Sequence, residues 1–428
     1  MKHRRWIGAV VSATLAAATT AACSSSGGGA GGKIHLTFWT HTHPPMIALN
    51  KALIKEYEAK HPNVEISYEQ IPNTDFNTKM LASLSNGSGP DIINMDDVAL
   101  RGDYIPKKLL APLDYKAMGL SSQQAVEDGY IAGTLDGAKG SDGTLYGLPT
   151  EFNATAFAIN TEQFRKAGLN PDQPPATWDD VATDGKKLLA AKQGGFNFLY
   201  LSAGQYTQQL QILLNETGGS IVDKAGQKAT IDSPQGVAAL SIWNRLTNVD
   251  KVGDPHTASR DATAPFADFE AGKTSMTIMY PWGVGQIKQD NPATYAKMKV
   301  VPLPQVDPAH PSGRWYGYYE AVNKASKHKA EAWKFIQYSA SQSQRWLTDV
   351  NFIQPLKGWA QSPAAKNVPF LPVWEQAYSQ GRFDEVGHHW NEVQDAVKTA
   401  VEDTVLNGKP VADSLKQAAK TINEALPD

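Results

Sequence analysis

The alternation of strand and helix patterns between residues 34 and 95 limits the fold more than any other feature of the chain. Apolar and polar side chains alternate in the first two expected strands, the third is a short apolar run, and apolar side chains recur on one face of the expected helices. The expected strands cover 34–38, 64–69 and 91–95, and the expected helices cover 46–60 and 76–84. Because parallel strands are joined by such crossover helices, the pattern predicts an α/β fold with a mainly parallel sheet flanked by helices.

The same mixture of elements continues toward the C-terminus. Residues 155–160 and 274–280 have strand patterns, and 329–347 has a helical packing stripe. In open parallel sheets, ligands bind beyond the carboxyl ends of the strands. Two of those ends are expected at 40–43 and 96–97, so these two loops are the first places to look for a binding site.

Length and composition describe a globular chain of ordinary charge. The 428 residues are enough for two domains, and 41% hydrophobic with 19% charged residues is typical of a folded protein. A formal net charge of -3 gives no indication of nucleic-acid binding. The chain also has 11 Trp, 15 Tyr and 13 Phe, whose stiff, flat rings can fill a core or form a wall under a ligand.

The N-terminal 32 residues have the pattern of an exported and anchored protein. Residues 1–22 combine a basic start with an apolar stretch too short for a membrane span, as in a signal peptide. Cys23, the single cysteine, completes a motif that resembles the lipobox of bacterial lipoproteins, except that Thr20 stands where Leu is usual. Residues 23–32 are rich in Ser and Gly and are expected to be a flexible tether. We therefore expect lipid attachment at Cys23 and a location on the extracellular face of the cell membrane, with plain secretion as the alternative.

Several motifs spread along the mature chain occur in an order and spacing typical of one family. They are found at 36–39, 89–93, 110–114, 142–149, 269–273, 279–282 and 325–336, and the stretch 142–149 is the most diagnostic. Together they resemble the extracellular solute-binding proteins of ABC sugar importers, the group that includes maltodextrin-binding protein. The resemblance covers nearly the whole mature chain.

The resemblance implies two α/β lobes that close on a ligand by a hinge motion. Three crossings of the chain between the lobes are expected near 150–153, 316–320 and 352–356. Lobe 1 is expected to comprise 33–150 plus 320–352, and lobe 2 to comprise 151–319 plus 353–428. The resemblance further implies a monomeric binding protein, not an enzyme and without a cofactor, that delivers a mono- or oligosaccharide to the membrane permease subunits of an ABC importer.

Four polar residues are expected to bind sugar hydroxyl groups, which need bidentate acceptors and donors. Asp96 and Asp97 follow the third expected strand, where the family supplies a carboxylate, although either could instead be a helix N-cap. Glu151 begins the first expected crossing, and Asn153 shares its side of the extended chain. An exposed linker glutamate is the alternative for Glu151.

Aromatic residues are expected to stack on the apolar faces of a sugar ring. Trp282 matches the tryptophan that performs this role in the family, and the neighbouring Pro281 and Gly283 argue for a loop against a place in the core. Tyr316 and Tyr318 lie on one side of the aromatic second crossing and are also candidates. Weaker candidates are Tyr206, Trp359 and Trp390.

His41 and His43 follow the first strand and are expected to contact the ligand through their ring nitrogens. Their spacing also allows a metal site completed by His388 and His389. A zinc site needs three or four converging ligands, and two separate pairs do not show convergence. The sequence therefore favours hydroxyl binding over a metal at these histidines.

Two other functions remain open from the sequence. A secreted glycoside hydrolase is also rich in aromatic residues and uses a pair of carboxylates, but pairs are easily found among 43 Asp and Glu. The same fold could instead bind a glycerol phosphodiester, a polyamine or a metal. An anionic solute calls for Arg or Lys at the site, and only Arg101 and Arg314 lie near the candidate motifs. This scarcity favours a neutral solute.

Overall fold

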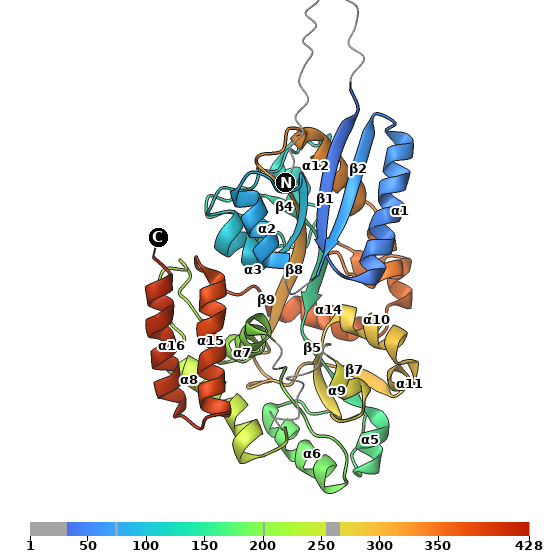
Figure 1. The fold of residues 1–428 in the computed structure, drawn as a ribbon. Coiled ribbons are helices and arrows are strands. Elements are labelled where there is room, and N and C mark those ends of the chain that lie inside the picture. The colour runs from blue at the N-terminus through green and yellow to red at the C-terminus, as the bar shows by residue number, and fades with distance from the viewer. Residues whose placement is uncertain (1–31, 73–75, 200–201, 254–265, 428) are drawn as a thin grey trace, which may run out of the picture.

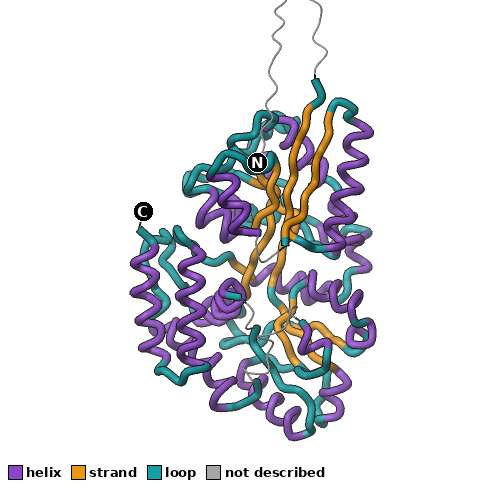
Figure 2. Tube along the Cα trace, in the orientation of Figure 1, coloured by secondary structure: helices purple, strands orange, loops and turns teal. Residues whose placement is uncertain are grey.

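The computed structural model describes residues 32–427, apart from 73–75, 200–201 and 254–265. Cys23, the signal peptide and all of the tether except residue 32 lie outside the described residues. The described chain forms two lobes, each with its own sheet and a cover of helices (Figures 1 and 2). None of its helices combines the length and apolarity needed to cross a bilayer.

The first lobe contains a six-stranded mixed sheet in the order β2-β1-β3-β8-β4, with the short β9 paired to β8. The strands are β1 (Ile34–His41), β2 (Val64–Ile71), β3 (Ile92–Asp96), β4 (Gly147–Ala154), β8 (Gly313–Val322) and β9 (Gly381–Arg382). β1 runs parallel to β2 and β3, as the strand–helix rhythm predicts. β8 runs antiparallel to both β3 and β4.

The helices of the first lobe pack against this sheet and bury its apolar side chains. The main ones are α1 (Pro44–Lys60), α2 (Phe76–Ser85) and α12 (Lys329–Ala340), with the short α3 (Asp97–Ala99), α4 (Gln123–Glu127) and α13 (Ser343–Arg345). Phe38 of β1 is fully buried, and the centroid of its ring lies 6.0 Å from that of Phe335 in α12. The core therefore lies between the sheet and these helices.

The second lobe has a three-stranded sheet in the order β6-β5-β7. The strands are β5 (Ala156–Asn160), β6 (Met276–Met279) and β7 (Met298–Val301), and both outer strands run antiparallel to β5. The two-lobed α/β fold is thus confirmed, but the expectation of a mainly parallel sheet is wrong for this lobe. The reason is the direction of entry: β5 continues from β4 and runs away from the first lobe, whereas both β6 and β7 pair with it in the opposite direction.

Helices surround this second sheet, and the last two helices of the chain pack on the same lobe (Figure 1). Their bounds are α5 (Thr161–Lys166), α6 (Trp178–Ala190), α7 (Ala203–Thr217), α8 (Pro234–Asn244), α9 (Ala267–Glu270), α10 (Pro281–Asp290), α11 (Pro292–Tyr295), α14 (Leu371–Gln380), α15 (Trp390–Val405) and α16 (Val411–Ala425). α15 packs against α7, and α16 packs against α8. The aromatic core of this lobe includes Phe157, Trp178 and Trp243, each at most 2% exposed.

Three chain segments pass between the lobes. β4 leads into β5 with only Thr155 between them, and β8 returns along β4. The third segment follows residue 350. It lies beside β4, because the backbone N–H of Phe152 in β4 donates to the carbonyl of Ile353 at 2.9 Å. These segments form the three-crossing hinge that the fold class predicts.

Two expected elements are shorter in the structure than in the sequence pattern. α12 ends at Ala340 instead of 347, because the chain turns so that the buried Trp346 indole donates to the carbonyl of Ser339 at 3.0 Å. β6 covers only Met276–Met279, because Pro281 begins α10 directly after it.

Candidate ligand-binding site

A cavity of about 770 Å³ lies between the lobes, within the usual size range of small-molecule sites. The first lobe contributes the end of β1 and the start of α1, and the second lobe contributes α7 and α10. The crossing strands β4 and β8 and the segments 347–351 and 364–369 complete its walls. The cavity therefore lies where the carboxyl end of β1 meets the hinge.

Two neutral histidines, the buried His41 and the half-buried His43, line the first-lobe wall. His41 is the last residue of β1, and its ring lies 4.4 Å from that of Tyr318. His43 is the N-cap of α1 and accepts from the backbone N–H of Met46. Burial lowers the pKa of His41 to about 3 and that of His43 to about 4, so both rings are uncharged near neutral pH. Nδ1 of His41 is buried and has no hydrogen-bond partner among the described residues.

Glu151 supplies the buried carboxyl group of the cavity. It lies in β4 opposite Tyr318 of β8, directly after a register shift in the pairing of the two strands. Its side chain is 4% exposed, and burial raises its pKa to about 7. Nδ2 of Asn153 donates to Oε1 of Glu151 at 2.7 Å. Asn153 itself does not line the cavity, so its visible role is to hold Glu151 in place.

Trp282 forms an aromatic wall in the first turn of α10. Its indole Nε1 donates to the hydroxyl of Tyr316, and its ring is parallel to that of Tyr280 at 6.0 Å. The side chain is half-buried and lines the cavity together with Tyr316 and Tyr318. A fully enclosed core position, the alternative from the sequence, does not describe Trp282. The structure thus brings His41, His43, Glu151 and these three aromatic residues to one cavity.

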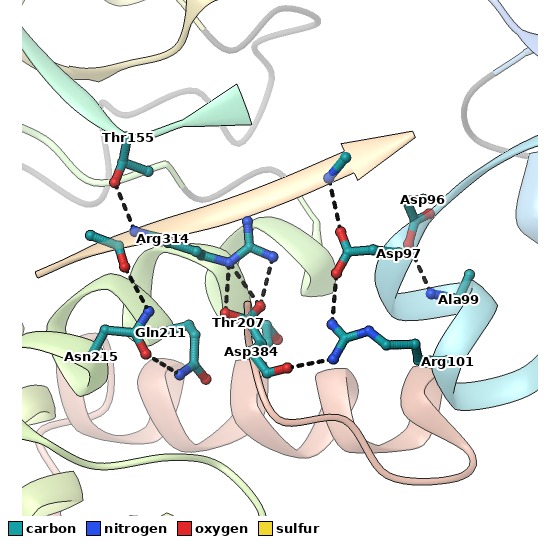
Figure 3. A network of polar contacts seen from close by, with 12 residues as sticks. Asp96, Asp97, Ala99, Arg101, Thr155, Thr207, Gln211, Asn215, Arg314 and Asp384 are labelled. Atoms are coloured by element: carbon teal, nitrogen blue, oxygen red, sulfur yellow. Dashed lines mark hydrogen bonds and ion pairs between the residues drawn. The ribbon is translucent and has the colours of Figure 1, made fainter. Parts of the chain in front are cut away.

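Asp96 and Asp97 are not brought to the cavity. Asp96 accepts from the backbone N–H of Ala99 at 2.9 Å, which is the N-cap role that the sequence left open, and burial raises its pKa to about 6. Asp97 is 1% exposed, and both of its carboxylate oxygens are occupied (Figure 3). One accepts from the backbone N–H of Gly317 at 3.0 Å, and the other pairs with Arg101 at 2.7 Å.

The weaker aromatic candidates also lie outside the cavity wall. Tyr206 and Trp390 are core residues, at 1% and 2% exposure, and Trp359 packs against Tyr378. Helical periodicity explains why Tyr206 does not reach the cavity. Its side chain points from α7 into the core, whereas Gln205 and Gln208 on the same helix line the cavity.

Sequence reasoning missed the polar residues that line the outer part of the cavity. They are Gln205, Gln208, Gln286, Gln289 and Asn351. The signal for two of them is the spacing from Trp282, because residues four and seven positions later on a helix share its face. That signal is visible only once residues 281–290 are known to be helical.

The charges around the cavity are few. Arg101 and Arg314 do not line it; they pair with Asp97 and Asp384. Among the described lining residues the one basic side chain is Lys288, and the acidic ones are Glu151, Asp290 and Asp349. Within the described part of the chain, no cluster of three or more His, Cys, Asp or Glu residues is arranged to hold a metal ion.

Comparison with known proteins places this chain among binding proteins. Residues 42–346 match the family model for bacterial extracellular solute-binding proteins. A putative binding protein from Brucella abortus is 25% identical, over 86% of this chain and 87% of the relative. The arabinooligosaccharide-binding protein of Bacillus subtilis is 24% identical, over 92% of this chain and 90% of the relative.

Solved structures agree on the fold. The maltose-bound MalE3 of T. maritima superimposes with a TM-score of 0.79 at 20% identity, covering 91% of this chain and 99% of that chain. The family match spans well over half of the sequence and includes the loop after β1, the hinge strands and α10. The protein therefore belongs to the family of bacterial extracellular solute-binding proteins.

Proposed function

We propose that the protein captures a neutral mono- or oligosaccharide outside the cell and delivers it to an ABC importer. The observation that carries this proposal is the convergence of Glu151, Trp282 and Tyr318 on one cavity. A carboxylate accepts from adjacent sugar hydroxyls, and aromatic rings stack on the apolar C–H face of a pyranose. The names of relatives support it, since one is an arabinooligosaccharide-binding protein.

The distribution of charge argues against the other solutes. A phosphodiester needs basic donors, but Arg101 and Arg314 are already paired with carboxylates outside the cavity wall. A polyamine needs several ionised carboxylates, whereas the most buried one, Glu151, has a pKa of about 7 and is only partly ionised near neutral pH. A neutral polar solute is the best match to the buried part of this cavity.

Delivery follows from the two-lobed fold. We propose that the two lobes close over the sugar by bending the three crossings, near 150–153, 316–320 and 352–356, where β4 and β8 extend from the sheet of the first lobe toward the second. The closed form of a monomer is then presented to the permease subunits. The protein acts by binding and release, without chemical change to the sugar.

The proposed location is the extracellular face of the cell membrane. Cys23 would carry the lipid anchor after removal of residues 1–22, and the Ser/Gly-rich residues 23–32 would give the lobes freedom to reach the permease. Mass spectrometry of the membrane-extracted protein tests this, because diacylation at Cys23 adds a lipid mass that Cys23→Ser lacks.

A thermal-shift screen against saccharides tests the main proposal. A ligand at 100 times its dissociation constant should stabilise the protein by roughly 2.7 kcal/mol. Glycerol phosphodiesters, polyamines and divalent cations form the comparison panel, and chromatography of the recovered sugar tests for cleavage. Stabilisation by a member of that panel and by no saccharide would overturn the sugar assignment, and a shortened sugar would indicate a hydrolase.

A further inference from the structure

One side-chain amide ties the start of α10 to the third crossing between the lobes. Asn351 follows the helical turn at 346–350, and its Nδ2 donates to the carbonyl of Pro281, the first residue of α10. Within the described chain, the N-cap residue Tyr280 makes no capping hydrogen bond with its side chain. The amide of Asn351 is therefore a specific polar contact that holds the first turn of this helix.

The backbone of Asn351 and the residue facing it are both suited to a close contact. Asn351 has φ 65° and ψ 30°, the left-handed conformation, which asparagine adopts more readily than most other residues with a side chain. One turn further along α10, a Cβ atom at Gly285 would lie 3.1 Å from Cβ of Asn351. Glycine at position 285 therefore allows α10 and the crossing to approach closely without a clash.

The first lobe holds the other side of the same segment. Val350 and Phe352, on either side of Asn351, are buried in a cluster with Met46 of α1. The ring centroid of Phe352 lies 4.8 Å from that of His43, the N-cap of α1. Asn351 is therefore fixed against α1 through its neighbours, and its amide extends this fixed point to α10 in the second lobe.

Trp282 is the cavity residue that depends most directly on this contact, because it follows Pro281 in the first turn of α10. Its indole Nε1 donates to the hydroxyl of Tyr316, and its ring packs against the cluster that contains Val350 and Phe352. A rotation or shift of the first turn would change both contacts. The orientation of the aromatic wall is therefore linked to the third crossing.

We propose that Asn351 is a positioning residue for Trp282. By holding the carbonyl of Pro281, it keeps the first turn of α10 in the orientation in which the indole bonds to Tyr316 and lines the cavity. This role acts through Pro281 and needs no contact between Asn351 and a sugar. Its effect on affinity rests on the proposed sugar-binding function, whereas the positioning itself is measurable in the sugar-free protein.

Hydrogen exchange of the Trp282 indole N–H, followed by NMR without sugar, tests the positioning. Its signal is assigned by its loss in Trp282→Phe. Asn351→Gly removes the amide and keeps a residue that adopts the left-handed conformation, and exchange should become about tenfold faster as the first turn opens more often. Gly285→Ala places a methyl group against Asn351 and should also accelerate exchange, although alanine favours a helix more than glycine does.

The opposite end of α10 provides the matched control. Nδ2 of Asn291 donates to the carbonyl of Glu270 at 3.0 Å, so Asn291→Ala also removes an amide-to-carbonyl contact of this helix. Asn291 does not line the cavity, and its variant should keep the wild-type exchange rate at Trp282 even where urea unfolding shows lower stability.

Calorimetric titration measures the consequence for binding. The probes are glucose, mannose and arabinose, together with maltose, mannobiose and arabinobiose. For each sugar that binds the wild type, Asn351→Gly should raise the dissociation constant by about tenfold, because the stacking wall is no longer held in place. Asn291→Ala should leave it unchanged.

The outcomes separate the positioning role from the proposed function. A wild-type exchange rate in Asn351→Gly would overturn the positioning role, and so would an equal acceleration in Asn291→Ala. Faster exchange with unchanged sugar affinity would also overturn it, because the orientation of Trp282 would then not matter for binding. If none of the six sugars binds the wild type, the sugar function fails, and the exchange rates alone decide whether Asn351 positions Trp282.

Discussion

The guanidinium of Arg314 binds both carboxylate oxygens of Asp384 (Figure 3). Its Nε donates to Oδ1 at 3.0 Å and to Oδ2 at 2.8 Å, and its Nη2 lies 2.7 Å from Oδ2. Both side chains are at most 2% exposed. Arg101 donates to the backbone carbonyl of Asp384 and also pairs with Asp97, so one network joins the end of β3, strand β8 and the segment before α15. Arg314 also lies over the ring of Tyr316, 5.3 Å from its centroid, and so helps to position a cavity residue.

Removing the Asp384 carboxylate should destabilise the protein strongly. Asp384→Ala leaves the Arg314 charge buried without its partner, a loss of about 3–5 kcal/mol for such pairs. Urea unfolding followed by circular dichroism measures the change. Asp172→Ala, which removes an exposed partner of Lys299, is the control and should have little effect. Equal stability of the two variants would show that the buried pair is not a structural link.

Saccharide affinity should increase between about pH 6 and pH 8. Burial raises the pKa of Glu151 to about 7, and sugar hydroxyls bind the ionised carboxylate better, so deprotonation favours binding by up to about tenfold. His41 and His43 contribute nothing here, because their lowered pKa values keep them neutral over this range. Calorimetry at several pH values measures the trend. Glu151→Gln should bind more weakly and lose the dependence, and a wild-type profile that is flat would exclude Glu151 as an acceptor.

Trp282 should contribute to affinity through its ring face. Trp282→Ala removes the stacking wall and the donor to Tyr316, and we expect the dissociation constant of the bound saccharide to rise by about tenfold or more. Trp282→Phe keeps a ring and should lose less. Trp359→Ala, which removes a partly exposed tryptophan outside the cavity, is the control and should leave affinity unchanged. A wild-type dissociation constant for Trp282→Ala would remove this residue from the site.

Stability should depend on pH through Glu320, a carboxyl group outside the cavity. It is 1% exposed with Oε2 unpartnered among the described residues, and burial raises its pKa from 4.5 to about 8. Between these values the folded state holds a proton that the unfolded state has released, so this group lowers stability as pH rises.

Glu320→Gln removes that titration and provides the measurement. The variant should match wild type near pH 4.5 and become more stable by at least about 1.4 kcal/mol above pH 8, the value of one pKa unit. Glu424→Gln, at an exposed position on α16, should follow wild type at every pH. A constant difference between Glu320→Gln and wild type would contradict the raised pKa.

The sequence by itself determined the α/β class and most of the first lobe, because local alternation of side chains reports which face of each element is buried. It also determined that Glu151, Trp282, Tyr316 and Tyr318 are candidates, since their types suit a sugar. The chain order and the parallel direction of β1, β2 and β3 follow from the same local rules, whereas α1 begins at Pro44, two residues before its expected start.

The tertiary structure decided the direction of the strands in the second lobe and the final membership of the cavity. Asp97 has the right chemistry for a sugar, but its oxygens bind Gly317 and Arg101, residues that only folding brings beside it. Gln286 and Gln289 carry no motif and reach the cavity because α10 lies along it. Local patterns report burial and periodicity. Whether a polar side chain binds another part of the protein or can bind a ligand depends instead on the distant segments that folding brings beside it.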